Sequence, residues 1–225
     1  DDRGRLYFNY NEDWLRCDLV PGIFGVRAAD VGCMPGLNHR LMPITTCYPT
    51  HITPGVNRGY QQGRLVDYKL AIHTAVCGPY CYRDDVLPFP GDVFACEPAG
   101  NLVRRIRLVE PDGAMRGENP YEAEKRDFLC STDERFRPVN LFGGPDGALY
   151  VVDMYRGVIQ HKNFVTSFLR DQIVKRQLEQ PIGMGRIWAV RPTGLTIDTA
   201  PPLADATAAV LVEALGSAKG TQRDL

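Results

Sequence analysis

Side chains that can bind ligands or move protons gather at both ends of one stretch, "FRPVNLFGGPDGALYVVDMYRG", residues 136–157. Asp153, Tyr155 and Arg156 directly follow an apolar run, and Arg137 precedes another. A carboxylate at such a place can act as a general base, while guanidinium and phenol groups can bind the oxygen atoms of an anion or a cofactor. An aspartate in a turn also often accepts hydrogen bonds from the backbone two residues on, so Asp153 has a structural interpretation as well.

A second group of polar side chains lies in "GVNRGYQ", residues 55–61, where Asn57, Arg58 and Gln61 are close in sequence. Amides and a guanidinium can together hold the polar atoms of a cofactor. The candidates for cofactor binding are therefore Asn57, Arg58, Gln61, Arg137, Tyr155 and Arg156.

Glu97 occupies a place like that of Asp153 in an earlier part of the chain. Each stands six residues after a glycine, Gly91 and Gly147 respectively, that begins the same local pattern. If the pattern is a structural repeat, both carboxylates lie near the same end of the fold, where carboxylate and carbonyl oxygens could hold Ca²⁺. The sequence therefore marks Glu97 and Asp153 as candidate metal ligands.

A general base has few sources among the histidines. The chain has 4 of them, and His161, just past a predicted strand, is the best placed for proton transfer. His161 and Asp153 are the candidate catalytic residues, and a structural or solvent-exposed role stays open for each.

The charge balance excludes several classes of partner. With 26 Lys and Arg residues against 27 Asp and Glu, the net charge is -1, so no overall field attracts nucleic acid or an anionic membrane. No apolar run reaches the roughly 18 residues that a transmembrane segment needs. The first residues, "DDRGRLYFNY", enter directly into a strand pattern, and we expect the chain to be a piece of a longer protein.

The 7 cysteines are more than a reduced cytosolic protein of this size usually carries. Their spacings fit neither a zinc site nor a haem attachment motif. We expect an extracytoplasmic chain with one or two disulfides, and Cys77 with Cys96, on successive predicted strands, is the first candidate pair.

A short pattern recurs four times along the chain and predicts the fold. It consists of a glycine, an aliphatic residue two positions on and an aromatic residue three on, and it begins at Gly4, Gly91, Gly147 and Gly185. The first three copies continue through a polar turn into a second apolar run, which predicts β-hairpins. Units of about 40 to 50 residues with insertions have the size of one four-stranded propeller blade. We therefore predict an all-β chain with roughly three to four blades of a propeller.

Two stretches break the β pattern. "NFVTSFLRDQIVKRQLEQPIG", residues 163–183, predicts an insertion helix that Pro181 stops, and "PPLADATAAVLVEALGS", residues 201–217, predicts a second helix. Residues 24–62 are rich in proline and glycine, which indicates a long connection or an irregular blade edge. The expected organisation is a propeller part at 1–192, a linker at 193–202 and the start of a helical region at 203–225.

These hairpins resemble those of six-bladed glucose/sorbosone dehydrogenase-like propellers and their relatives with NHL-type repeats. The longer string "CSTDERFRPVNLFGGPDGALYVVDMYRGVIQH", with "GVNRGYQ" and "CGPYCYRDDVLP" before it, is similar to the propeller of bacterial membrane-bound dehydrogenases. In those large secreted proteins, HEAT-like helical repeats and a c-type cytochrome domain follow the propeller. The resemblance covers most of residues 4–192, and the tail "LVEALGSAKGTQRD" is similar to the opening helix of the HEAT-like part.

The resemblance implies a periplasmic or secreted oxidoreductase-like module that oxidises a sugar or alcohol, with the quinone PQQ and Ca²⁺ as cofactors. It also implies that electrons pass to haem c on a domain outside this chain. The arginine-asparagine-x-glutamine signature of soluble quinoprotein glucose dehydrogenases is not found, since "GVNRGYQ" has the same residue types in another order. The alternatives are a non-catalytic propeller that binds carbohydrate or a partner protein, and a lactone hydrolase, which would require a metal at the centre of the channel.

Overall fold

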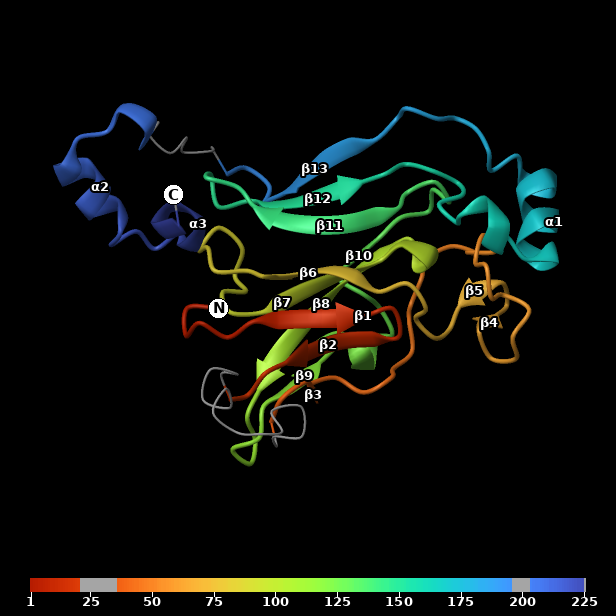
Figure 1. Cartoon of the computed structure of the whole chain (residues 1–225), viewed down its shortest axis with the longest axis horizontal. Helices are drawn as coiled ribbons and strands as arrows, with labels where there is room; N and C mark the ends of the chain where they lie inside the picture. The colour runs from red at the N-terminus through yellow and green to blue at the C-terminus, as the bar shows by residue number, and fades with distance from the viewer. Residues whose placement is uncertain (21–35, 196–202, 225) are drawn as a thin grey trace.

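The computed structural model describes residues 1–20, 36–195 and 203–224 of the chain, and most of its regular structure is antiparallel β-sheet (Figure 1). The prediction of a mainly β chain is therefore confirmed. The described strands form four separate sheets and no closed ring.

The strands are grouped into an N-terminal sheet, a central sheet, a third sheet and a small two-stranded sheet. The N-terminal sheet contains β1 (Tyr7–Tyr10), β2 (Asp13–Cys17) and β3 (His39–Arg40). The central sheet has the order β10 (Leu129–Cys130), β8 (Leu102–Val109), β7 (Val93–Glu97) and β6 (Cys77–Cys81), and β9 (Arg116–Glu118) pairs with β8. The third sheet has the order β11 (Pro138–Gly143), β12 (Leu149–Asp153) and β13 (Arg186–Val190). The small sheet contains β4 (Leu65–Val66) and β5 (Lys69–Leu70).

The glycine repeats correspond to strands, but not all to the predicted hairpins. The first two copies form the antiparallel pairs β1–β2 and β7–β8, as predicted, and the stretch 136–157 forms the pair β11–β12. The repeat glycines at 4, 91 and 147 have positive φ angles, which glycine adopts without strain. The glycine of the pattern thus marks the turn that comes before each of these strands.

The third copy was expected to pair with the apolar run that follows it, and this prediction is wrong. Residues 158–160 form no strand, and β12 pairs instead with β13, the strand of the fourth copy. The chain leaves the sheet after Asp153, forms the insertion and returns at Arg186, which is the register partner of Asp153. The sequence pattern favours a hairpin between neighbouring segments. The pairing of β12 with the distant strand β13 is therefore visible only in the structure.

The central sheet is packed on both of its faces. Along β7, Val93 and Ala95 belong to a core shared with the N-terminal sheet, whereas Phe94 and Cys96 belong to a second core shared with β11 and β12. All five residues of β7 are buried. Figure 1 shows the third sheet on one side of β6, β7 and β8 and the N-terminal sheet on the other. The three sheets therefore form stacked layers.

The predicted insertion helix is present but shorter than expected. Helix α1 covers Ser167–Arg176 and begins where the Thr166 hydroxyl accepts a hydrogen bond from the backbone of Leu169. It ends before Pro181, because Gln177 adopts a left-handed conformation and its backbone N–H closes the last turn. The chain that follows buries Leu178.

The described part of the C-terminal segment, residues 203–224, contains two short α-helices where one was predicted. Helix α2 covers Ala208–Ala214, within the predicted range, and α3 covers Gly220–Asp224. Two short 3-10 turns are used below: η3 (Pro98–Gly100) and η5 (Lys162–Phe164). Part of the predicted linker, 196–202, and residues 24–35 of the predicted irregular region lie outside the described residues. Among the described helices, none combines the length and apolar character needed to cross a membrane.

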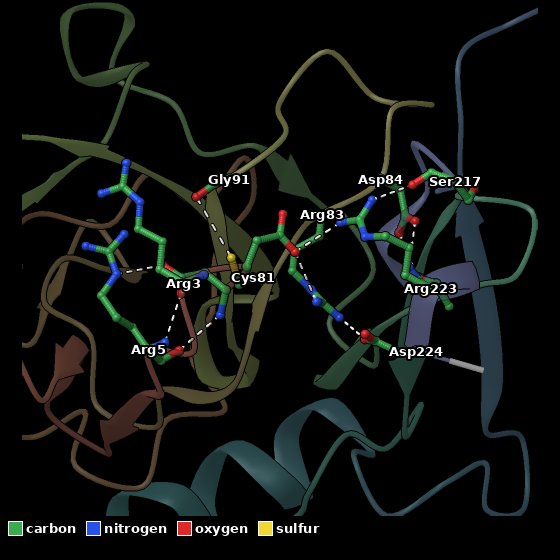
Figure 2. A network of polar contacts seen from close by, with 12 residues as sticks. Arg3, Arg5, Cys81, Arg83, Asp84, Gly91, Ser217, Arg223 and Asp224 are labelled. Atoms are coloured by element: carbon green, nitrogen blue, oxygen red, sulfur yellow. Dashed lines mark hydrogen bonds and ion pairs between the residues drawn. The ribbon is translucent and has the colours of Figure 1, made fainter. Parts of the chain in front are cut away.

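A cluster of charged side chains fixes α3 against the loop after β6. Arg83 forms ion pairs with Asp2 and Asp224, and Arg223 of α3 lies 3.0 Å from the same Asp2 carboxylate. Asp84 accepts hydrogen bonds from the backbone and hydroxyl groups of Thr221 at 3.0 and 2.8 Å. Figure 2 shows Arg83 extending toward Asp224. The first residues of the chain, the β6–β7 loop and α3 thus meet at one place.

Candidate functional site

A cavity of about 520 Å³ lies where several loops meet at one end of the sheets. Binding sites for small ligands have volumes of about 300 to 1,000 Å³, so the size is suitable. We call it the Arg137 cavity. Its lining residues are Asn11, Gly55, Asn57, Arg58, Thr74, Ala75, Ala99, Arg137, Val158, Ile159, Gln160, Phe164 and Leu169.

Arg137 is the buried cation of this cavity. Its side chain is 3% exposed, and all three guanidinium nitrogens donate to backbone carbonyl oxygens. Nε donates to Arg156 at 3.1 Å, Nη1 to Pro98 at 2.6 Å and Nη2 to Gly157 at 2.9 Å. The segments that follow β7 and β12 therefore supply the carbonyl groups that hold the guanidinium in place.

Burial makes the charge of Arg137 costly. Loss of hydration lowers the pKa of Arg137 to about 10, although the negative charges of Glu97 and Asp153 act in the opposite direction. Among the described residues, no carboxylate oxygen forms an ion pair with this guanidinium. The cation is thus stabilised by peptide dipoles and by carboxylates that it does not contact.

Glu97, one of the predicted metal ligands, is the last residue of β7 and is completely buried. Its Oε2 accepts hydrogen bonds from the backbone N–H groups of Thr74 and Ala75 at 2.9 and 3.0 Å, and its Oε1 accepts one from Ala99 at 3.1 Å. Burial raises the pKa of Glu97, while these three N–H donors lower it. The carboxylate therefore shapes the cavity wall, because Thr74, Ala75 and Ala99 all line it.

Asp153 is the last residue of β12 and is also buried. Its Oδ1 accepts hydrogen bonds from the backbone N–H groups of Arg137 and Tyr155, each at 2.8 Å. Its Oδ2 accepts one from Trp188 Nε1 at 3.1 Å and lies 3.8 Å from Arg186 Nε. Both oxygens are thus engaged in the turn and in the β12–β13 pairing.

Each of the two predicted metal ligands is the last residue of its strand, and the charges of both act on Arg137. Across the parts of the chain that the structure describes, no group of three or more His, Cys, Asp or Glu side chains is arranged to hold a metal ion. Ca²⁺ binding by Glu97 and Asp153, and the role of Asp153 as a base, stay predictions.

Asn57 reaches the cavity from the loop before the small sheet. Its Nδ2 donates to the carbonyl oxygen of Phe164 at 3.0 Å, and its Oδ1 accepts from the N–H of Thr166 at 3.0 Å. The Asn57 amide therefore connects this loop to the start of α1, which forms the opposite wall.

Arg58, the next residue, lines the cavity at its surface. Its Nη1 pairs with Glu12 Oε1 at 2.7 Å, and both side chains are about half exposed. Gln61 lies outside the lining, where its side-chain oxygen accepts a hydrogen bond from Arg64 Nη2 at 3.2 Å. Of the three candidates in "GVNRGYQ", the fold thus brings Asn57 and Arg58 to Arg137.

Tyr155 and Arg156 stand beside the cavity without lining it. Tyr155 has a positive φ, donates its hydroxyl to Asp133 at 2.8 Å and stacks its ring against the Arg186 guanidinium, 3.6 Å away. Arg156 contributes through its backbone carbonyl, which holds Arg137. Their positions fit a supporting role for the turn.

His161, the predicted base, is exposed and stands at the start of η5. Its Nδ1 accepts a hydrogen bond from the backbone of Asn163 at 3.3 Å, and its ring lies 5.5 Å from that of Phe164. Gln160, its neighbour, lines the cavity, whereas His161 does not. Among the residues that the structure describes, no histidine or carboxylate side chain is part of the lining.

Sequence reasoning missed Gly55, Thr74 and Gln160 as cavity residues. Gly55 had a signal, because it opens the polar motif "GVNRGYQ", and a side chain there would come within 2.9 Å of Arg137 Nη2. Thr74 and Gln160 lie outside the strands of the structure, and their residue types gave no sign of a binding site. Their proximity to Arg137 depends on how the sheets stack.

The predicted disulfide partners Cys77 and Cys96 are direct register neighbours on β6 and β7. Both are free thiols in the structure. Burial raises the pKa of Cys77 to about 12. Directly opposed antiparallel residues have Cα atoms about 4.5 to 5.5 Å apart, within the range of disulfides, so oxidation of the pair stays a prediction.

Taken together, the fold and the site define a mainly β chain of stacked antiparallel sheets, with a ligand-sized polar cavity built around a buried arginine. A family described as "Domain of unknown function (DUF7133)" matches residues 1–194, and the chain belongs to this family. No curated protein and no solved structure matches the chain.

Proposed function

We propose that this chain is the ligand-binding propeller part of an extracytoplasmic oxidoreductase-like protein, and that the Arg137 cavity receives a sugar or alcohol. One observation carries the proposal. Three residues chosen from sequence for cofactor binding, Asn57, Arg58 and Arg137, line one cavity although about 80 positions separate the first from the last.

The stacking of the sheets supports the propeller part of the proposal. In a propeller, each small sheet buries its two faces against its neighbours. The central sheet is packed in this way, since β7 contributes to a core on each side. The glycine repeat and the resemblance to bacterial membrane-bound dehydrogenases point in the same direction.

The chemistry of the cavity is suited to polar and anionic groups. Arg137 and Arg58 provide two guanidinium groups, and Asn57, Thr74 and Gln160 provide uncharged hydrogen-bonding groups. A quinone cofactor such as PQQ, which carries carboxylates, would pair with Arg58 at the surface of the cavity. The electrons would then pass to a c-type haem domain outside this chain.

A second function, a non-catalytic domain that binds carbohydrate, is favoured by one specific observation. Oxidation of an alcohol requires a base near the carbinol proton, and the described cavity lining contains neither a histidine nor a carboxylate. Ligand binding needs no such group. The two proposals therefore share the cavity and differ in whether electrons move.

A titration of the chain with PQQ and Ca²⁺, followed by sugar-dependent reduction of a dye, separates the two functions. Arg58→Gln tests the cavity, and Arg107→Gln is its matched control, because both arginines are about half exposed and pair with a glutamate. We expect Arg58→Gln to weaken PQQ or sugar binding about tenfold, the equivalent of about 1.4 kcal/mol, and Arg107→Gln to leave it unchanged.

The outcomes distinguish the alternatives. Sugar binding together with dye reduction supports the oxidoreductase, while sugar binding without PQQ binding or dye reduction supports the carbohydrate-binding domain. If neither PQQ nor any sugar binds, both proposals are wrong.

A further inference from the structure

Arg137 lines the cavity and has hydrogen-bond donors that no described protein group accepts. A guanidinium carries five N–H groups, two of them on each Nη. Nη1 and Nη2 each make one bond to a carbonyl, so within the described part of the chain one N–H on each nitrogen has no protein acceptor. A pair of parallel N–H groups on one guanidinium matches the two oxygens of a carboxylate.

Gly55 lies directly against this guanidinium, and both residues line the cavity. A Cβ atom at Gly55 would lie 2.9 Å from Arg137 Nη2. Any side chain at this position would therefore press against the guanidinium on the wall of the cavity. Buried arginines without a carboxylate partner are costly, so an anion in the cavity would relieve the cost.

The nearby carboxylates do not fill the role of that anion. Glu97 directs its oxygens to three backbone N–H groups, and Asp153 directs its oxygens to two backbone N–H groups and Trp188. Both side chains are fixed and buried. The cavity side of Arg137 therefore presents positive charge.

The rest of the wall fits hydroxyl groups. Asn57, Thr74 and Gln160 surround the same space with uncharged polar side chains, and Phe164 adds an aromatic surface. A second depression shares Asn11 and Arg58 with the Arg137 cavity and continues past Tyr10. The site thus combines one anion-binding point with a polar wall of the kind that sugars require.

We propose that the ligand of the Arg137 cavity is a carboxylate-bearing sugar, such as a hexuronate, whose carboxylate binds the two free N–H groups of Arg137. This inference rests on the proposed function and names its ligand class. The sugar hydroxyls then contact Asn57, Thr74 and Gln160, and a second sugar unit can extend toward Tyr10.

Isothermal titration of the chain with D-glucuronate and D-glucose tests the inference, because the two sugars differ only in the carboxylate. We expect D-glucuronate to bind at least tenfold more tightly, in line with a charge-assisted bidentate contact. Acetate, which has the carboxylate without the sugar, is expected to bind at least tenfold more weakly than D-glucuronate.

Gly55→Ala places a Cβ 2.9 Å from Arg137 Nη2 and keeps the charge of the arginine. Gly185→Ala is the matched control, since a Cβ there makes only ordinary contacts at 3.5 Å or more. We expect the first variant to lose the preference for D-glucuronate and the second to keep it. Circular dichroism of each variant confirms folding, and the comparison of sugars on the unmodified chain stands even if Gly55→Ala fails to fold.

If D-glucose binds as tightly as D-glucuronate or more tightly, the inference is overturned and the proposed function stays in place. The same conclusion follows if D-glucose binds and acetate binds as tightly as D-glucuronate. If neither sugar binds and PQQ does not bind, the proposed function itself fails together with the inference.

Discussion

Replacing Asp127 by asparagine removes one partner of the most deeply buried ion pair described in the chain. Asp127 and Arg104 have fully buried side chains, and Nε and Nη2 of the arginine lie 2.6 and 3.1 Å from the two carboxylate oxygens. Asp127 also accepts a hydrogen bond from the backbone of Tyr48 at 2.9 Å. The pair thereby ties β8 to the segment that leads to Gly55.

The expected loss of stability follows from the burial. Removing one member of a buried pair leaves the other charge without its counter-ion, which costs about 3–5 kcal/mol. Arg104 retains its bonds to Thr45 Oγ1 and the carbonyl of Thr46, both 2.6 Å, and its stacking on Trp14 at 4.1 Å. We therefore expect Asp127→Asn to lower the free energy of unfolding by about 3 kcal/mol, the lower end of that range.

Urea unfolding followed by tryptophan fluorescence measures this change, since Trp14 is buried beside Arg104. The matched control is Glu118→Gln, which breaks the exposed ion pair between Glu118 of β9 and Arg107 of β8, the strand that also carries Arg104. This variant should lower the free energy of unfolding by less than about 1 kcal/mol. A value for Asp127→Asn no larger than that of Glu118→Gln would refute the reasoning.

Three further predictions concern pH, oxidation and sheet packing. Burial lowers the pKa of His73, so the unfolded chain binds a proton on this side chain more readily than the folded chain does. The free energy of unfolding should therefore fall as the pH drops below about 6.5, the usual histidine value. Urea unfolding at several pH values measures this dependence, and His73→Gln should remove it. Oxidation of Cys77 and Cys96 would close a loop of about 20 residues and stabilise the fold by about 3 kcal/mol, and mass spectrometry after alkylation should show two fewer free thiols. Gly78→Ala should lower the free energy of unfolding by several kcal/mol, because Gly78 has a positive φ and the new Cβ would lie 2.7 Å from a Cα atom of β11. The control Gly113→Ala, at a positive φ with open space around it, should lower it by about 1–2 kcal/mol, and thermal unfolding measures both.

Local signals predicted the strands well. The glycine at the start of each repeat needs a positive φ at three of its four positions, and the apolar runs that follow became β1, β7, β12 and β13. Turn chemistry is local, so it can be read from a few adjacent residues. The insertion helix was also recognisable, although the left-handed residue Gln177 that ends it carries no strong sequence signal.

The pairing of β12 with β13 was not predictable in the same way. The residues after Asp153 have the composition of a second hairpin strand, and the choice against it depends on contacts such as Trp188 Nε1 with Asp153, 35 positions apart. The docking of α3 by Arg83 and Asp2 was missed for the same reason, since these residues are far from α3 in sequence.

The candidate site was predicted in part. Arg137, Asn57 and Arg58 were chosen by residue type and do line one cavity, whereas His161 and Gln61 do not. Residue type indicates which groups can bind a ligand. It does not indicate that Glu97 and Asp153 turn their oxygens toward backbone N–H groups, because those donors belong to loops that only the fold brings near.

The burial of β7 on both faces has a consequence for how this family can vary. No position from Val93 to Glu97 faces solvent. Every substitution in the strand must therefore either fit the packing of one of the two cores or replace a buried hydrogen bond. Mutational scanning should therefore find β7 the least tolerant strand of the chain. New ligand preferences would arise instead in the loops that surround Arg137, where most lining residues belong to neither core.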